Sequence, residues 1–252
     1  MAGRAAGRRD GMMDIVLIHG GSTSGQVWSL MTPHLAHPAL AVDLPGRNDP
    51  TDYATANFSD WARDVVRQMD EAGLGQVVAV AHSMGGGTMA ALARLFPERV
   101  LGVICFGAVV PPDGAPFLEG LNQPQRELMH RTRAQGSVVL PRPVKSPPDE
   151  ADPRRALMRD ANSTEALAPF FEPVSLQGLR GVHRGLVKLM RDKAIELERQ
   201  GAFVERLCAL GPVEVRELEA GHMAMVTHPA QSAAVIDELC AAFERAETAA
   251  AS

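Results

Sequence analysis

The sequence predicts an α/β fold, in which one domain is built on a mostly parallel, doubly wound sheet. Short apolar runs, typical of strands buried on both faces of a parallel sheet, recur along the 252 residues. Segments with helical spacing lie between several of these runs. Strands that alternate with helices are typical of βαβ units, and the chain is long enough for one full hydrophobic core.

The expected elements follow one another along the chain. A helix is predicted over Phe58–Ala72 because its apolar residues share one face, Ser59 can cap it and Gly73 stops it. A second helix, Met84–Phe96, ends before Pro97. A last amphipathic helix covers Ala230–Ala246, and the predicted strands are Asp14–Ile18, Ala39–Val42, Gln76–Ala81, Val100–Val110, Leu186–Met190 and Val213–Leu218.

The alternating pattern stops after the fourth strand. From Pro111 to about His183 the sequence has no convincing buried strand. We therefore expect a helical cap at 111–183, inserted into a core formed by residues 14–110 and 184–246. The helices expected in the cap are Gln123–Ala134, Pro153–Asp160 and Ser163–Phe171, and a Pro-rich loop is expected at Pro141–Pro148.

Composition narrows the possible functions. Apolar residues make up 46% of the chain and charged residues 22%, a normal globular balance. A net charge of −5 argues against nucleic acid as a partner. Arg4, Arg8 and Arg9 do cluster, but they fall in a tail, residues 1–13, that we expect to be disordered like residues 247–252. Met12 and Met13 are candidate start residues besides Met1.

Location and redox state are also constrained. No stretch approaches the roughly 20 apolar residues of a membrane span, and the basic N-terminus lacks the apolar core of a secretory signal. The three cysteines, Cys105, Cys208 and Cys240, are too few and too widely spaced for a disulfide framework or a zinc site. We expect buried or half-buried reduced thiols, a cytoplasmic protein without a membrane partner, and no metal.

The segment Val77–Gly87 carries the clearest chemical signal. A buried strand runs into Ala81-His82-Ser83-Met84-Gly85, and a helix begins at once. Such a sharp strand–turn–helix strains the central serine and lifts its hydroxyl above the sheet. Residues two before and two after this serine must be small because the backbones approach closely. We predict Ser83 as a nucleophile; a serine that merely caps the helix is the alternative.

A serine hydroxyl needs a base to remove its proton. Of the eight histidines, His222 is the best candidate, because it follows the last strand and projects from the sheet's carboxyl edge, where open α/β sheets bind ligands. His82 is expected to point away from the nucleophile and to be structural. His19 is expected to brace the first loop.

A carboxylate must then orient the imidazole. Asp192 directly follows the strand Leu186–Met190, and the order Ser83, Asp192, His222 is the one expected for this kind of sheet. Asp113, just beyond the fourth strand, is the second candidate acid. A helix N-cap is the alternative role for Asp192.

The tetrahedral intermediate needs two hydrogen-bond donors for its oxyanion. The backbone N–H of Met84, at the start of a helix, is one candidate. The other is assigned to Gly21, since His19-Gly20-Gly21 lets the backbone approach a substrate closely. The run Gly85-Gly86-Gly87 lacks the Lys-Ser/Thr ending of a phosphate loop, so close packing of helix on sheet explains it better.

Taken together, these motifs resemble the α/β-hydrolase superfamily, and within it the branch of methylesterases, hydroxynitrile lyases and pyrethroid-hydrolase-like carboxylesterases. The resemblance runs from about residue 14 to 242 and is weakest in the cap. It rests on His19-Gly20-Gly21 with Trp28 downstream, Asp43-Leu44-Pro45-Gly46, Ala81–Gly86, Asp192, Gly221-His222-Met223, Arg159–Ser163 and Phe171-Glu172-Pro173. It implies the α/β-hydrolase fold, the same site residues, and no metal or organic cofactor.

Two residues depart from the family's pattern. Ala81 replaces the usual glycine, which is sterically tolerable. Met223 stands where hydroxynitrile lyases carry a lysine beside the catalytic histidine, and this argues against lyase chemistry. Ser83 also excludes the aspartate-nucleophile mechanism of the dehalogenase and epoxide-hydrolase branches.

The leading hypothesis is hydrolysis of an ester, lactone or thioester of a hydrophobic small molecule through an acyl-enzyme. A lyase, decarboxylase or cyclase on the same fold, or a receptor that keeps the triad, are the alternatives. Either a monomer or a homodimer is compatible with the sequence. Candidate substrate-binding residues are Gly20, Trp28, Phe117, Leu121, Met158, Phe170 and Met223.

Overall fold

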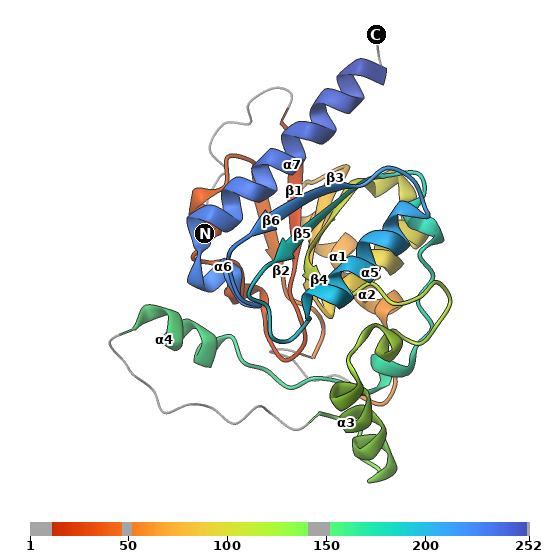
Figure 1. The fold of residues 1–252 in the computed structure, drawn as a ribbon. Coiled ribbons are helices and arrows are strands. Elements are labelled where there is room, and N and C mark those ends of the chain that lie inside the picture. Colours follow the sequence, from red (N-terminus) through yellow and green to blue (C-terminus); the bar gives the residue numbers. More distant parts are fainter. Residues whose placement is uncertain (1–11, 47–51, 141–151, 251–252) are drawn as a thin grey trace.

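A six-stranded sheet forms the centre of the computed structural model, which describes residues 12–46, 52–140 and 152–250. Every pair of neighbouring strands is parallel, and the strand order is β2-β1-β3-β4-β5-β6 (Figure 1). The strands are β1 (Asp14–Ile18), β2 (Ala39–Val42), β3 (Val77–Ser83), β4 (Val100–Ala108), β5 (His183–Leu189) and β6 (Glu214–Leu218). The predicted parallel α/β sheet is confirmed.

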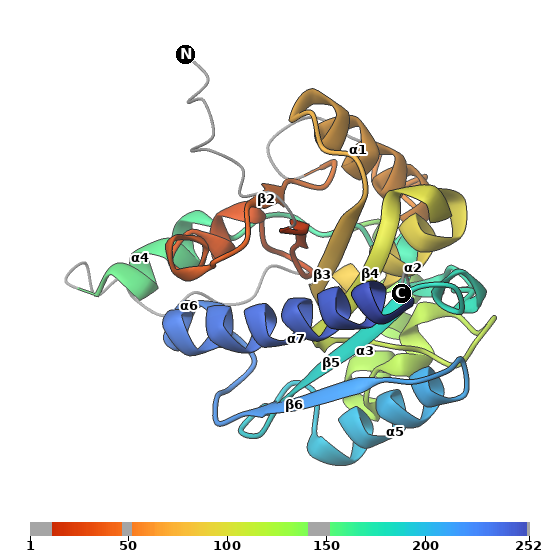
Figure 2. The same ribbon diagram turned by 90° about the horizontal axis from the view of Figure 1, so that it is seen from above.

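Helices cover both faces of this sheet, as a doubly wound fold requires. One face carries α1 (Phe58–Glu71), α2 (Gly85–Leu95) and α5 (Leu197–Cys208). The other carries the short α6 (Ala224–Thr227) and the long α7 (Pro229–Ala250) (Figures 1 and 2).

Strand β1, which lies between β2 and β3, shows why the sheet needs a layer of helices on each face. Successive side chains of a strand point to opposite faces, and all five residues of β1 are buried. Val16 and Ile18 pack into the apolar cluster under α1 and α2, whereas Ile15 and Leu17 pack into the cluster under α7. The continuous apolar run in the sequence is therefore a strand covered on both sides.

Helix α1 begins at Phe58 as predicted, but its cap differs. The side chain of Asn57, and not that of Ser59, accepts the N–H of Asp60 at 2.8 Å. Past the end of the helix, Gly73 adopts a left-handed φ of 70°.

The segment between β4 and β5 contains two of the three predicted cap helices, α3 (Gln123–Ala134) and α4 (Pro153–Asp160). They lie apart, below the carboxyl edge of the sheet (Figures 1 and 2). The prediction of a helix over Ser163–Phe171 is wrong. Only Ala168–Phe171 forms a short 3-10 helix, because Ala166 pairs instead with Val139 in an isolated antiparallel bridge. The predicted loop Pro141–Pro148 lies outside the described residues.

Three further features differ from expectation. Helix α5 was not predicted from the sequence. Helix α7 runs to Ala250, so residues 247–250, expected in a disordered tail, are helical. Cys105 and Cys240 are buried as expected, but Cys208 is exposed.

Residues 1–11, most of the N-terminal tail expected to be disordered, fall outside the described residues. No helix in the part of the chain that the structure describes is long and apolar enough to cross a membrane.

Candidate active site

Ser83 occupies the last position of β3, and helix α2 starts two residues later. Its φ of 49° is left-handed, a conformation that among the described non-glycine residues only Ser22 shares. A Cβ added to Gly85 would lie 2.7 Å from the carbonyl oxygen of His19 and 2.9 Å from that of Ile18. This close approach of α2 to β1 is the physical reason why the turn requires a small residue after the serine.

His222 and Asp192 meet at the same edge of the sheet. Nδ1 of His222 lies 2.7 Å from Oδ2 of Asp192, whose side chain is fully buried. The other carboxylate oxygen accepts the N–H groups of Ala194 at 2.7 Å and Ile195 at 3.0 Å. Asp192 therefore contacts His222 and closes its own loop. It is not a helix N-cap, the alternative role considered for it, because α5 (Leu197–Cys208) begins five residues later and its N-cap is Glu196.

Asp113, the second candidate acid, is engaged elsewhere. Its carboxylate accepts the N–H of Leu176 at 2.7 Å and a hydrogen bond from the side chain of Gln177. Asp113 thus holds a segment of the cap, whereas Asp192 contacts His222.

His82 lies against His222 and supports its loop. The ring centroids are 4.5 Å apart, and Nε2 of His82 donates to the carbonyl oxygen of His222 at 3.0 Å. Burial, and secondarily the nearby charge of His222, hold the pKa of His82 well below its ordinary value. His82 is therefore neutral, with its proton on Nε2, and adds no positive charge beside His222.

Two hydrogen bonds fix the loop that carries Gly21. The carbonyl oxygen of Gly20 accepts from Nδ1 of His19 at 2.8 Å and from the hydroxyl of Thr23 at 2.9 Å. Nε2 of His19 in turn accepts the N–H of Leu44 at 3.1 Å, so His19 braces the loop as expected. Because the C=O and N–H of a trans peptide point in opposite directions, these bonds also set the direction of the Gly21 N–H.

A cavity of about 180 Å³ opens beside Ser83. The two candidate oxyanion donors, Gly21 and Met84, lie on its wall with the serine. Most of the remaining wall is apolar, but two polar cap side chains, Gln125 and Glu165, also face it. The lining residues are Gly21, Ser22, Ser83, Met84, Val109, Phe117, Leu121, Gln125, Met129, Leu140, Glu165 and Phe170.

The predicted substrate-binding residues divide into two groups. Phe117, Leu121 and Phe170 line the cavity, whereas Gly20, Trp28, Met158 and Met223 do not. Trp28 is fully buried, with its ring 6.3 Å from that of His82 and 6.1 Å from that of Phe106. Met158 and Met223 are partly buried against the same apolar cluster as Trp28.

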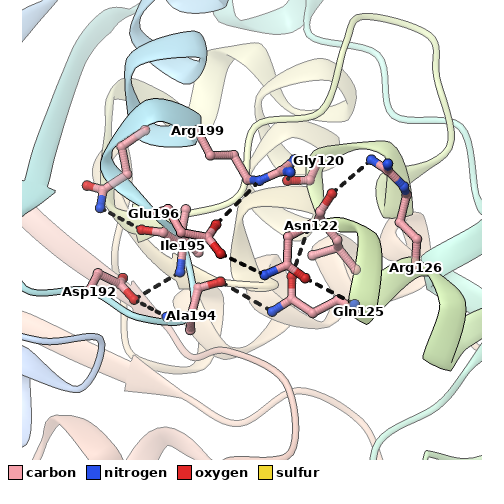
Figure 3. A network of polar contacts seen from close by, with 11 residues as sticks. Gly120, Asn122, Gln125, Arg126, Asp192, Ala194, Ile195, Glu196 and Arg199 are labelled. Atoms are coloured by element: carbon pink, nitrogen blue, oxygen red, sulfur yellow. Dashed lines mark hydrogen bonds and ion pairs between the residues drawn. The ribbon is translucent and has the colours of Figure 1, made fainter.

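Two polar residues on the cavity wall, Gln125 and Glu165, were not among the site residues predicted from the sequence. Gln125 lies in the first turn of α3, where it forms a capping box with Asn122. Its amide also donates to the carbonyl oxygen of Ala194 at 3.3 Å, and Asn122 donates to Glu196 at 3.1 Å (Figure 3). These bonds tie α3 to the loop that follows Asp192. The capping-box pattern was readable from the sequence, but the contact across the fold was not.

Within the described residues, no group of three or more His, Cys, Asp or Glu side chains could hold a metal ion. The candidate site combines the strained Ser83 on the wall of a small cavity with the hydrogen-bonded pair of His222 and Asp192.

The chain belongs to the Alpha/beta hydrolase family, whose family model matches residues 15–235. Among curated relatives, it is 36% identical over 114 residues to a dihydrolipoyllysine-residue acetyltransferase component of the acetoin cleaving system from Cupriavidus necator. It is 33% identical over 99 residues to a pimeloyl-[acyl-carrier protein] methyl ester esterase from Yersinia enterocolitica. These matches cover 44% and 38% of this chain, but only 29% and 36% of the relatives.

Solved structures share the fold over nearly the whole chain. An extracellular α/β-hydrolase from a Paenibacillus species superimposes with a TM-score of 0.75 at 19% identity, covering 90% of this chain and 98% of the other. A pyrethroid hydrolase from Sphingobium faniae gives a TM-score of 0.70 at 24% identity and covers 92% and 98%. These similarities agree with the α/β-hydrolase fold that the sequence motifs predict.

Proposed function

We propose that this protein is a serine hydrolase that cleaves esters of small hydrophobic molecules through an acyl-enzyme. The hydrogen bond between buried Asp192 and His222, at the same sheet edge as the strained Ser83, is the observation that carries the proposal. Membership of the α/β-hydrolase family and the methyl ester esterases among the partial relatives support ester hydrolysis in general.

His222 acts as the base. Because Asp192 accepts the hydrogen bond from Nδ1, the proton of neutral His222 resides on Nδ1 and its Nε2 carries the free lone pair. Nε2 takes the proton of Ser83 as Oγ attacks the carbonyl carbon of the ester. The carboxylate of Asp192 then stabilises the imidazolium without accepting its proton.

Gly21 and Met84 stabilise the negative charge that develops on the carbonyl oxygen. Both residues line the same cavity as Ser83. Met84 precedes α2, so its N–H belongs to the helix terminus, where donors have no partner within the helix. Preorganised donors of this kind typically contribute a factor of about 10²–10³ to the rate.

Collapse of the tetrahedral intermediate completes the first half of the reaction. The bond between the carbonyl carbon and the alcohol oxygen breaks, and imidazolium His222 protonates the departing alkoxide. A water molecule then attacks the acyl group on Ser83 and gives its proton to His222. When this second intermediate collapses, the carboxylic acid leaves and Ser83 recovers its proton from His222.

Steady-state turnover of p-nitrophenyl esters tests this proposal. Wild-type protein is expected to release p-nitrophenol catalytically, and Ser83→Ala and His222→Ala are expected to lose activity by at least about 10³-fold. Ser232→Ala is a matched control, since Ser232 is also a buried serine but lies in α7. Turnover that survives in Ser83→Ala would contradict the acyl-enzyme mechanism. Absence of turnover in the wild-type protein would favour a lyase, decarboxylase or cyclase that uses His222 as a base.

A further inference from the structure

The loop beside the candidate oxyanion donor contains a second strained residue. Ser22 has a φ of 56°, a left-handed conformation that is unfavourable for a residue with a Cβ. It directly follows Gly21 and lies with it on the wall of the cavity. Such backbone conformations persist only where surrounding contacts hold them, and the contacts here come from the cap.

Two hydrogen bonds from the cap hold Ser22 on both sides. The N–H of Ser22 donates to Oε2 of Glu165 at 2.8 Å, and its carbonyl oxygen accepts the N–H of Ser163 at 3.0 Å. The first of these bonds fixes the peptide group between Gly21 and Ser22. That peptide adjoins the Gly20–Gly21 peptide, whose N–H is the candidate donor, so a rotation at Gly21 would misdirect it.

Glu165 is itself rigidly placed. It is only 1% exposed, and Oε1 accepts the N–H of Ala166 at 2.9 Å. Its backbone carbonyl accepts the N–H of Leu140 at 3.0 Å, within the antiparallel bridge between Val139 and Ala166. The side chain of Glu165 therefore cannot rotate freely, because its carboxylate is buried and bonded and its backbone is held in this bridge.

Gly21 is enclosed between this carboxylate and the nucleophile turn. A Cβ added to Gly21 would lie 3.2 Å from Oε2 of Glu165 and 3.3 Å from Sδ of Met84. The cap carboxylate thus contacts the donor loop at the point where Gly21 packs against the side chain of Met84.

We propose that Glu165 is a positioning residue for the oxyanion hole: its carboxylate holds the Gly21–Ser22 peptide so that the Gly21 N–H faces the reacting carbonyl. This role rests on the proposed ester hydrolysis. It makes the cap part of the catalytic machinery, since the donor loop and the residue that fixes it are 143 positions apart in the sequence.

The cap offers a matched control for this assignment. Glu172 also reaches from the cap to a backbone N–H of the core, that of Phe58, at 2.7 Å. It is not among the residues that line the cavity beside Ser83. Loss of the Glu172 carboxylate removes a bond of the same kind without touching the Gly21 loop.

The test compares Glu165→Ala, Glu165→Gln and Glu172→Ala with wild-type protein. The readouts are kcat and KM for p-nitrophenyl butyrate, the inhibition constant of an aryl trifluoromethyl ketone, and the melting temperature. Glu165→Ala is expected to lower kcat by about 10²-fold with little change in KM, because the oxyanion forms only in the transition state. Affinity for the ketone, whose tetrahedral adduct carries the same oxyanion, should fall in parallel.

The variants Glu165→Gln and Glu172→Ala distinguish a positioning role of Glu165 from a general effect on folding. Glu165→Gln keeps one oxygen that can accept the Ser22 N–H, but its NH2 group must then face the N–H of Ala166, so it should recover part of the kcat that Glu165→Ala loses. Glu172→Ala is expected to lower the melting temperature while kcat stays within about threefold of wild type. If Glu165→Ala leaves kcat unchanged, or lowers it no more than Glu172→Ala does, the positioning role is wrong although ester hydrolysis stands. If the wild-type protein itself shows no turnover, both proposals fail.

Discussion

Asp192 binds His222 with one carboxylate oxygen and closes its own loop with the other. The bond to Nδ1 of His222 is 2.7 Å long, and the two bonds to the backbone N–H groups of Ala194 and Ile195 are 2.7 and 3.0 Å long. A rotation of this carboxylate toward solvent would break all three bonds at once. The imidazole is therefore oriented by a group that the surrounding backbone already holds in place.

Substitution of this acid tests the orientation directly. Asp192→Asn keeps the size of the side chain but removes its charge and allows an amide to face Nδ1. We expect kcat to fall by roughly 10⁴-fold, because the wrong tautomer of His222 is then stabilised. Asp113→Asn serves as the control and should retain activity, because Asp113 contacts Leu176 and Gln177 in the cap. Equal losses in the two variants would refute the assignment of the acid.

Much of the geometry of the candidate site follows from short sequence patterns, each confined to a few neighbouring residues. The strand–turn–helix around Ser83 and the position of Asp192 after a strand are local features, and both could be predicted. Glu165 could not, because its partner Ser22 is 143 positions away. The sequence of Ser163–Phe171 predicts a helix, but Ala166 instead pairs with Val139 in an antiparallel bridge. Long-range pairing overrides local propensity there.

The pH dependence of the reaction should report one ionisation. The base must be neutral to accept a proton, so log kcat/KM should rise with pH to a plateau. His82 contacts His222, but burial keeps the pKa of His82 well below 6.5, so His82 stays neutral across this rise. We therefore expect a limiting slope no greater than one on the acid side of the profile, measured with a neutral ester. A slope of two would mean that His82 also loses a proton over this rise, against its lowered pKa.

His37 should make the stability of the fold depend on pH. Its ring lies 2.6 Å from Asp237 and 3.2 Å from Glu244, both on α7. The hydrogen bond to Asp237 is the main cause that raises the pKa of His37 above 6.5. A raised folded-state pKa means that the stabilisation is fully present below pH 6.5 and is lost as the pH rises through the folded-state value.

Urea unfolding of His37→Gln at two pH values measures this contribution. The variant should lose about 1.5–3 kcal/mol of unfolding free energy at pH 5.5, the range for hydrogen bonds to charged groups. The loss should be smaller at pH 9, because the stabilisation that comes with a raised pKa decreases as the pH rises through the folded-state value. His34→Gln, in the same loop but exposed, should show no such difference. An equal loss for His37→Gln at both pH values would show that the ring acts only through packing.

The glycine after the nucleophile should not tolerate a side chain. In Gly85→Ala the new Cβ would meet the carbonyl oxygens of His19 and Ile18 at 2.7 and 2.9 Å, so α2 must shift from the sheet. We expect a loss of about 1–3 kcal/mol in denaturant unfolding. Gly201→Ala, inside α5 with nothing within 4 Å of the new Cβ, should instead gain about 0.5–1 kcal/mol. A neutral Gly85→Ala would contradict the tight approach of α2 to β1.

The size of the cavity predicts the preferred acyl group. A volume of about 180 Å³ is below the roughly 300–1,000 Å³ of pockets for drug-sized ligands. We expect kcat/KM for p-nitrophenyl esters to be highest for acetate to butyrate and about tenfold lower for octanoate. Leu121→Ala, which shortens a side chain of the wall, should shift the optimum to longer chains. An unaltered preference in this variant would place the acyl group outside this cavity.

Covalent labelling shows whether Ser83 is an activated nucleophile. The protein is treated with a fluorophosphonate, and the adduct is counted by intact mass and located by peptide mapping. We expect one adduct per chain, on Ser83, which is absent from Ser83→Ala and forms much more slowly in His222→Ala. Folded protein that remains unlabelled, or an adduct on another residue, would contradict an activated Ser83.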